Sequence, residues 1–314
     1  LTGEKSSLGI IISYGENKEK IKKLINLSNL GNNEISKYPE IGFIGAGNYA
    51  SRVLVPTFAK YNANLYSIAA SSGLDPIQIA KKFNFKQVTT DIDTLIKDKN
   101  CKCIVIATRH DSHASLIIKS IKAGKHIYVE KPLCLNLQEL NEIENNYFKY
   151  LDSQNTDFSP IFMIGFNRRF APLIQKLRAI LKNNVSMKSI IYTCNAGFIE
   201  EDHWIQSSKY GGGRLIGEAI HFIDLLRFIV DKPIENLQIN FAKDNKSLND
   251  TFIISMIFKD GSIGSINYFA NGNKKFKKER IELFSNGQIY QIDNFKKLNI
   301  WGKNKNLEEK LFFQ

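Results

Sequence analysis

A charged pair, Glu130-Lys131, stands directly after the apolar segment Ile127–Val129, and a proline follows it. A charged pair at the carboxyl end of a buried strand is poorly explained by packing, because ligands of open α/β sheets collect at that edge. An ammonium there can stabilise negative charge that develops on a reacting hydroxyl or carbonyl oxygen. We therefore expect a catalytic role for Lys131, with an ordinary salt-bridged surface lysine as the competing interpretation.

A glycine turn forms the second candidate site, because Gly45, Gly47 and Ala50 follow a strand predicted over Ile41–Ile44 and begin a helix. The first glycine permits a tight turn, the second lets the backbone approach a diphosphate, and the small residue at 50 keeps helix and strand close. The helix start, with Asn48 and Tyr49, adds free N–H groups and a partial positive charge. This placement predicts a binding site for the diphosphate of a dinucleotide.

The residues that would hold the rest of a dinucleotide are less clearly marked. Ser71 and Ser72 stand where an acidic residue would hold the adenosine ribose, and no arginine follows to bind a 2′-phosphate, so both NAD and NADP are retained as cofactors. Thr108, His110 and His113 follow the strand predicted over 103–107 and are candidates for contacts with ribose or nicotinamide. For the two histidines, a surface or helix-capping position is the more usual role.

Strands and helices alternate from residue 39 to 166, with strands predicted over Ile41–Ile44, Leu65–Ala70, Cys103–Ala107, Ile127–Val129 and Pro160–Gly165. Alternation of this kind predicts an α/β fold with a doubly wound parallel sheet, a Rossmann domain. From 167 to 314, two helices (Pro172–Leu181 and Gly217–Val230) precede or interrupt long strand-like segments, and Asp260-Gly261 and Asn286-Gly287 mark hairpin turns. This part predicts an α+β domain with a mostly antiparallel, open sheet.

Residues 1–38 stand apart, because the polar stretch Gly31–Pro39 separates them from the Rossmann pattern. We expect an N-terminal appendage or the tail of a preceding module. Within it Leu8–Ser13 is strand-like, and the apolar spacing over 21–27 predicts a helix.

Composition excludes several classes of protein. No apolar stretch approaches the ~20 residues that span a bilayer, and there is no secretory signal, so we expect a cytoplasmic protein without a membrane partner. The net charge of +12 favours nucleic-acid binding, but lysine is spread along the chain. The densest basic stretch, Asn273–Arg280, is interpreted as a solvated hairpin end, and no nucleic-acid partner is expected. The four cysteines lack zinc spacing, and no metal site is expected.

Five motifs occur in order along the chain: Gly42–Ala50, Val105–Thr108, Ala123–Pro132, Gly165–Phe170 and Gly211–Asp224. Together they resemble the Gfo/Idh/MocA oxidoreductases, the glucose–fructose oxidoreductase and inositol dehydrogenase group, over about residues 40–300. The resemblance implies NAD(P)-dependent hydride transfer to or from a carbon of a sugar, nucleotide sugar or cyclitol. It also implies homo-oligomers that form through the C-terminal sheet.

The resemblance further assigns roles to residues. Lys131 corresponds to the family's catalytic lysine, whose bond to the following proline is often cis, and with Glu130 it is expected at the cofactor. His221 corresponds to the active-site histidine. Many relatives carry an aspartate four residues before it, where this chain has Gly217, and Glu218 would point about 100° away along a helix. That departure keeps a non-catalytic, dinucleotide-binding sensor or regulator as the alternative function.

Three residues are candidate substrate contacts. Arg168, with its neighbour Arg169, can reach substrate anions, and an interdomain salt bridge is the competing role. Trp204 can stack on a sugar or base, with core packing as the competing role. Asp224 lies one helical turn beyond His221. Several segments look most like a subgroup fused behind a zinc-type alcohol dehydrogenase module, in which the first forty residues would be the tail of that module.

Overall fold

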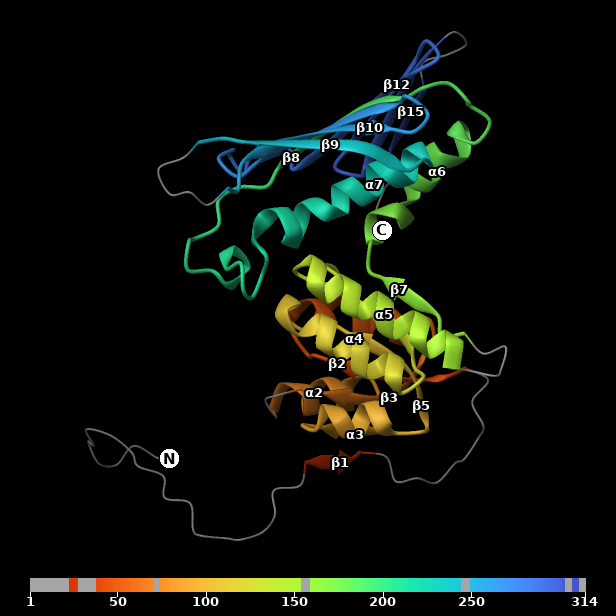
Figure 1. Cartoon of the computed structure of the whole chain (residues 1–314), viewed down its shortest axis with the longest axis vertical. Coiled ribbons are helices and arrows are strands. Elements are labelled where there is room, and N and C mark those ends of the chain that lie inside the picture. Colours follow the sequence, from red (N-terminus) through yellow and green to blue (C-terminus); the bar gives the residue numbers. More distant parts are fainter. Residues whose placement is uncertain are drawn as a thin grey trace, which may run out of the picture.

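The computed structural model describes residues 23–27, 38–70, 74–153, 159–243, 249–302 and 307–310. Two sheets, each with its own helices, are arranged one above the other and joined through strand β7 (Phe162–Ile164) and helix α6 (Pro172–Leu181) (Figure 1). The α/β fold class and the two predicted architectures are confirmed. No helix within the described residues is long and apolar enough to cross a membrane.

The first sheet has the strand order β1-β4-β3-β2-β5-β6-β7, and every neighbouring pair is parallel except β1 with β4. Its strands before β7 are β1 (Leu24–Asn26), β2 (Glu40–Ile44), β3 (Asn64–Ala69), β4 (Gln87–Thr89), β5 (Cys101–Ile106) and β6 (His126–Val129). The strand order reverses between β2 and β5, and crevices at such points bind ligands at the carboxyl ends of the strands. The glycine turn after β2 and Thr108 after β5 therefore flank one crevice.

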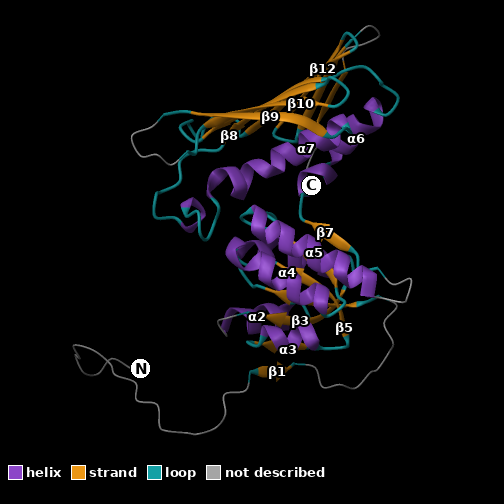
Figure 2. Ribbon diagram, viewed as in Figure 1, coloured by secondary structure: helices purple, strands orange, loops and turns teal. Residues whose placement is uncertain are grey.

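Helices cover both faces of this sheet because successive side chains of its strands point to opposite sides. Phe43 packs with α1 (Val55–Lys60) and α2 (Leu74–Lys82) on one face. Its neighbour Ile44 packs on the other face with α3 (Ile92–Lys97), α4 (His113–Lys122) and α5 (Leu137–Ser153). Figure 2 shows these helices beside the strands of the first sheet. The side chain of Asp91 caps the start of α3, and Gly124 with φ +65° ends α4.

The helix predicted over 21–27 is wrong for the part that the structure describes. Leu24–Asn26 forms β1, an edge strand paired antiparallel with β4 through Leu24 opposite Thr89 and Asn26 opposite Gln87. Backbone pairing with a strand distant in sequence outweighs a short helical spacing of apolar residues. Residues 8–13, predicted as a strand, lie outside the described residues.

The second sheet has the order β15-β14-β13-β12-β8-β11-β10-β9, and only β8 and β11 are parallel neighbours. Its strands are β8 (Ser189–Asn195), β9 (Ile234–Phe241), β10 (Phe252–Phe258), β11 (Ile263–Phe269), β12 (Glu279–Ser285), β13 (Gln288–Asp293), β14 (Lys297–Trp301) and β15 (Leu307–Lys310). Helices α6 and α7 (Ile220–Val230) bury one face of it. The predicted turn Asn286-Gly287 joins β12 to β13 with positive φ at both residues.

The interpretation of Asn273–Arg280 as a hairpin end is wrong. Strands β11 and β12 are not neighbours, because β8 lies between them. The connection therefore crosses the carboxyl end of β8, where the N–H of Asn195 donates to the carbonyl of Lys278 at 2.7 Å and that of Ala196 to Phe269 at 2.8 Å. The basic stretch is an arch over the end of β8.

Candidate active site

The glycine turn after β2 is held tightly on its inner side and is open on its outer side. Gly45 has φ +103°, its N–H donates to the carbonyl of Ala69 at 2.8 Å, and a Cβ there would overlap the carbonyl oxygen of Ala107. No described atom lies within 4 Å of a Cβ built on Gly47. The turn therefore presents bare backbone to free space, as a diphosphate requires. Ala50 is buried behind it, while Asn48 and Tyr49 are exposed.

The segment after β5 contains two buried histidines with different partners. His113 is fully buried, with Nδ1 2.7 Å from the carbonyl of Pro132 and Nε2 3.2 Å from that of Thr108. It thereby ties the end of β5 to the residues that follow Lys131. His110 instead places Nδ1 2.8 Å from the carbonyl of Gly211 and packs its ring against Trp204, with ring centroids 4.9 Å apart.

His110 and Trp204 thus meet each other where the two domains touch. Burial lowers the pKa of His110 to about 4, and burial also lowers the pKa of His113. Ser71 and Ser72, the candidates for the adenosine ribose, lie outside the described residues.

Lys131 reaches across from the Rossmann domain to the second domain. Its ammonium donates to the carbonyl oxygen of Gly217 at 2.5 Å, and its peptide bond to Pro132 is cis. Gly217 lies in a π-helical turn, Leu215–Ala219, that leads directly into α7 and so stands one turn before His221. Burial lowers the pKa of Lys131. The lysine and the histidine, from different domains, are therefore brought together.

His221 is held as a neutral imidazole. It is 7% exposed, and its pKa falls to about 2 because of burial first and then the positive charges of Lys131, Arg168 and Lys278. Its Nδ1 is buried without a hydrogen-bond partner among the described residues. Buried polar atoms are nearly always bonded, so this nitrogen is available to bond a water or a ligand atom.

The acidic member of the Glu130-Lys131 pair is also buried. Its carboxylate accepts a hydrogen bond from the hydroxyl of Tyr128 at 2.8 Å, and burial raises the pKa of Glu130. On the neighbouring side, Asn167 donates to the hydroxyl of Tyr49 at 3.2 Å and so connects the glycine turn to the start of the second domain.

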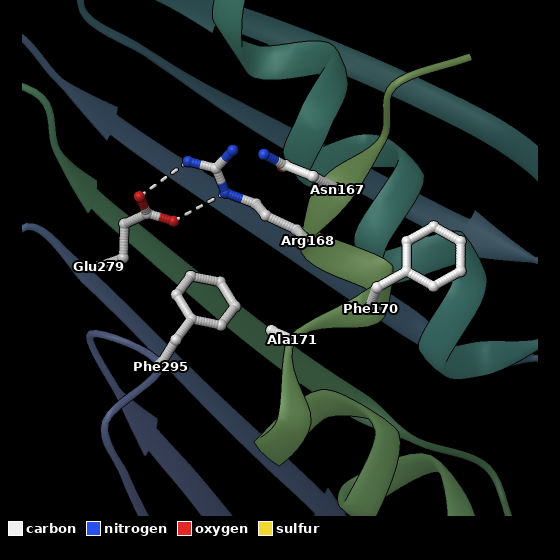
Figure 3. A pocket seen from close by; sticks show the side chains of 6 residues that line it. All are labelled: Asn167, Arg168, Phe170, Ala171, Glu279 and Phe295. Carbon is white, nitrogen blue, oxygen red and sulfur yellow. Dashed lines mark hydrogen bonds and ion pairs between the residues drawn. The ribbon is translucent and has the colours of Figure 1, made fainter. Parts of the chain in front are cut away.

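Both arginines after β7 are engaged by carboxylates of the second domain. Arg168 donates from Nε and Nη2 to Glu279 at 3.0 and 2.8 Å, beside a cavity of about 380 Å³ (Figure 3). Glu279 also accepts from the hydroxyl of Tyr192. Arg169 makes a two-pronged ion pair with Asp224. The Nε and Nη2 groups of Arg168 and Arg169 are therefore bonded to protein carboxylates rather than free to bind a ligand in the cavity, and the carboxylate of Asp224 is bonded to Arg169.

Two family models match this chain. Residues 40–147 match the oxidoreductase family with an NAD-binding Rossmann fold, Gfo/Idh/MocA, and residues 180–289 match the Gfo/Idh/MocA C-terminal domain. The chain belongs to the Gfo/Idh/MocA family.

Relatives of this Gfo/Idh/MocA protein are distant. The myo-inositol 2-dehydrogenase of Thermotoga maritima is 25% identical over 270 residues, which cover 83% of this chain and 77% of that protein. The NAD-linked scyllo-inositol 2-dehydrogenase of Bacillus subtilis is 26% identical over 178 residues, 56% of this chain and 48% of that protein. A levoglucosan dehydrogenase solved with NADH has the same fold, with a TM-score of 0.74 at 18% identity over 88% of this chain and 80% of that chain.

Where this Gfo/Idh/MocA chain departs from the family pattern, Glu218 does not occupy the place of the missing aspartate. Its carboxylate accepts from the hydroxyl of Tyr268 at 2.7 Å and from Nε of Arg214 at 2.8 Å. Lys131 instead bonds the backbone of residue 217.

The sequence reasoning missed three residues at this site: Asn167, Tyr128 and Lys278. Lys278 was marked only as part of the basic stretch, although its charge lowers the pKa of both His221 and Lys131. Asn167 stands inside one of the family motifs, next to the arginines that were selected. Among the described residues, no three His, Cys, Asp or Glu side chains are grouped so that they could hold a metal ion.

Proposed function

We propose that this chain is an NAD(P)-dependent dehydrogenase that moves hydride between a nicotinamide and a hydroxyl-bearing carbon of a sugar, nucleotide sugar or cyclitol. One observation carries the proposal: Lys131, from the carboxyl edge of the Rossmann sheet, bonds the helix segment that leads to His221. The family description and the inositol and levoglucosan dehydrogenases among its relatives support the same reaction.

The residues present fit a dinucleotide. The open face of the turn at Gly47 and the following helix start would receive the diphosphate, with Asn48 and Tyr49 at its rim. Thr108, Glu130 and Lys131 stand at the neighbouring strand ends, where the rest of the cofactor would lie. When bound, the nicotinamide supplies or accepts the hydride. We propose NAD or NADP, since the serines at 71 and 72 repel neither.

The two catalytic side chains have different roles: Lys131 stabilises charge and His221 transfers the proton. An ammonium has three N–H donors, and Gly217 takes one from Lys131, so the others are left to hold the substrate oxygen and stabilise its negative charge. His221 is neutral, so its unpartnered Nδ1 can accept the hydroxyl proton in oxidation and return it in reduction. His113 positions the lysine by holding the carbonyl of Pro132.

A substrate screen tests this function. Sugars, nucleotide sugars and cyclitols are supplied with NAD+ or NADP+, and nicotinamide absorbance is followed for the wild type, Lys131→Ala and His221→Ala. Turnover that both substitutions reduce is expected. Undiminished turnover in both variants would refute the assignment of the catalytic pair. Saturable NADH binding without oxidation of any hydroxyl substrate would favour the sensor.

The outer face of the second sheet supports association of two copies of the chain. Strand β10 buries Phe252, Ile254, Met256 and Phe258 against the helices, yet its outward positions also carry isoleucines. Exposed apolar side chains continue across neighbouring strands: Ile191, Ile253, Ile257, Ile263, Phe284 and Trp301. A contiguous exposed apolar patch of this kind is typical of a protein interface. We propose a homo-oligomer that forms through this face.

Two finer proposals rest on sequence features. The motif resemblance supports a C-terminal module fused behind a zinc-type alcohol dehydrogenase domain, which determination of the full reading frame would test. The four cysteines are free thiols, which favours a reducing compartment such as the cytoplasm. Fractionation of the source cells tests that placement.

A further inference from the structure

The arch between β11 and β12, residues 270–278, packs against the segment that follows β8. That segment leads to the contact with the Rossmann domain. The side-chain amide of Asn195 donates to the carbonyl of Asn273 at 2.8 Å. The stem of Lys274 lies so close to Gly197 that a Cβ there would be 3.2 Å from its Cε. The chain then continues to Trp204 and Gly211, which meet His110 of the Rossmann domain. The arch therefore packs against the start of the segment that connects β8 to the interdomain contact.

Some of the positive charges on this arch are neutralised within the second sheet and others are not. Lys277 and Arg280 both pair with Asp293, at 3.1 and 2.8 Å. The ammonium groups of Lys274, Lys275 and Lys278 have no ion pair or hydrogen bond among the described residues.

Lys278 is the one of these three that adjoins a cavity residue in the chain. It directly precedes Glu279, whose carboxylate holds Arg168 at the edge of the cavity (Figure 3). Its exposed ammonium belongs, with Lys131 and Arg168, to the group of cations that depress the pKa of His221. Arg168 is neutralised by its bidentate carboxylate, so Lys278 contributes positive charge that the protein itself does not balance.

Resting on the proposed function, we infer that the substrate is an anionic carbohydrate or cyclitol, with a carboxylate or phosphate ester that binds Lys278 while its reacting carbon lies at Lys131 and His221. The arginines selected from the sequence do not fill this role, because Glu279 and Asp224 occupy them. An anion at Lys278 would offset the repulsion among the cations and would ease protonation of His221 during oxidation. Lys278 is thus a specificity-determining residue.

Matched pairs of substrates test the inference. The probes are glucose against glucuronate and glucose 6-phosphate, and myo-inositol against inositol monophosphate. Wild type, Lys278→Gln and Lys259→Gln are compared. Lys259 is the control because it is an exposed lysine in the turn between β10 and β11, at the opposite end of β11 from the arch. In Lys278→Gln, the ratio of kcat/KM for the anionic over the neutral member is expected to fall about tenfold, mainly through KM, because a charge-assisted hydrogen bond is lost. Lys259→Gln keeps the wild-type ratio.

Calorimetric binding of the same sugars to the full chain gives a second readout that needs no turnover. Wild type is expected to bind the anionic members more tightly, with affinity that falls as salt is raised, and Lys278→Gln to lose that preference. A wild type that prefers neutral members, or an equal loss on both members in Lys278→Gln, overturns the inference and leaves the dehydrogenase proposal intact. DNA binding that Lys278→Gln abolishes while the sugar ratio stays constant assigns the arch to nucleic acid and also overturns it. If no sugar is oxidised, only the proposed function is refuted. Calorimetry still shows whether Lys278 binds the anionic sugars.

Discussion

The ammonium of Lys131 and the carbonyl oxygen of Gly217 are 2.5 Å apart, and their hydrogen bond joins the end of β6 to the turn that begins the helix of His221. The acceptor is backbone, so the contact needs no acidic side chain at 217. Holding the lysine in this way fixes the distance between the groups that would stabilise charge and move the proton.

Replacing Lys131 with methionine keeps the length of the side chain and removes its charge. We expect kcat to fall by about 10²–10³-fold, because stabilisation of the substrate oxygen is lost, while the Kd for NADH in a fluorescence titration changes far less. Lys122→Met, at an exposed position of α4, is the matched control and keeps full activity. A kcat for Lys131→Met within threefold of wild type would contradict the assigned role.

Alanine substitutions at the two glycines of the dinucleotide turn are expected to have different effects, one on stability and the other on cofactor binding. Gly45→Ala places a Cβ at φ +103° against the carbonyl of Ala107, so we expect a loss of about 1–3 kcal/mol or more in unfolding free energy. Gly47→Ala meets no described atom, so stability stays within ~1 kcal/mol of wild type. Its methyl group occupies the space meant for the diphosphate, and NADH affinity falls at least tenfold. Urea unfolding and NADH titration of both variants check this, and equal NADH affinity in Gly47→Ala and wild type would disprove it.

The parts of the fold that the sequence predicted well depend on neighbouring residues. Apolar runs, a glycine turn after the first strand and the Asn286-Gly287 hairpin each depend on a few adjacent positions, and the structure contains all of them. The role of Lys131 was predicted from its place after a buried strand and from the family motifs, and that of His221 from the motifs alone; both stay predictions, although the structure brings the two residues together.

The parts that could not be predicted depend on partners distant in sequence. Arg168 and Glu279 are 111 positions apart, and Arg169 and Asp224 are 55, so no local pattern shows that these arginines are occupied. The basic stretch was taken as a hairpin end because β11 and β12 follow one another in sequence, whereas β8 lies between them in the sheet.

The buried histidine makes stability depend on pH. Folding holds the pKa of His221 at about 2, whereas an unfolded histidine titrates near ~6.5. Below that pH the unfolded chain binds a proton that the folded chain does not, so unfolding free energy falls as pH falls, by up to ~1.4 kcal/mol per pH unit for this group. His221→Asn is expected to flatten the curve between pH 6.5 and 4.5 in urea unfolding. The exposed His203→Asn serves as control, and an unchanged slope in His221→Asn would count against a neutral, buried imidazole.

If the outer face of the second sheet is the oligomer interface, a single charged substitution there is expected to change the oligomeric state. Ile257 is 47% exposed at an outward position of β10, so Ile257→Lys adds charge to the proposed interface without entering the core. We expect the wild type to elute as an oligomer, and the variant as a monomer with nearly unchanged unfolding free energy, in size-exclusion chromatography with light scattering. Val185→Lys, at a 97% exposed position before β8, is the matched control and keeps the wild-type mass. A monomeric wild type, or an Ile257→Lys variant that retains the oligomeric mass, would remove the argument that this apolar face is an interface.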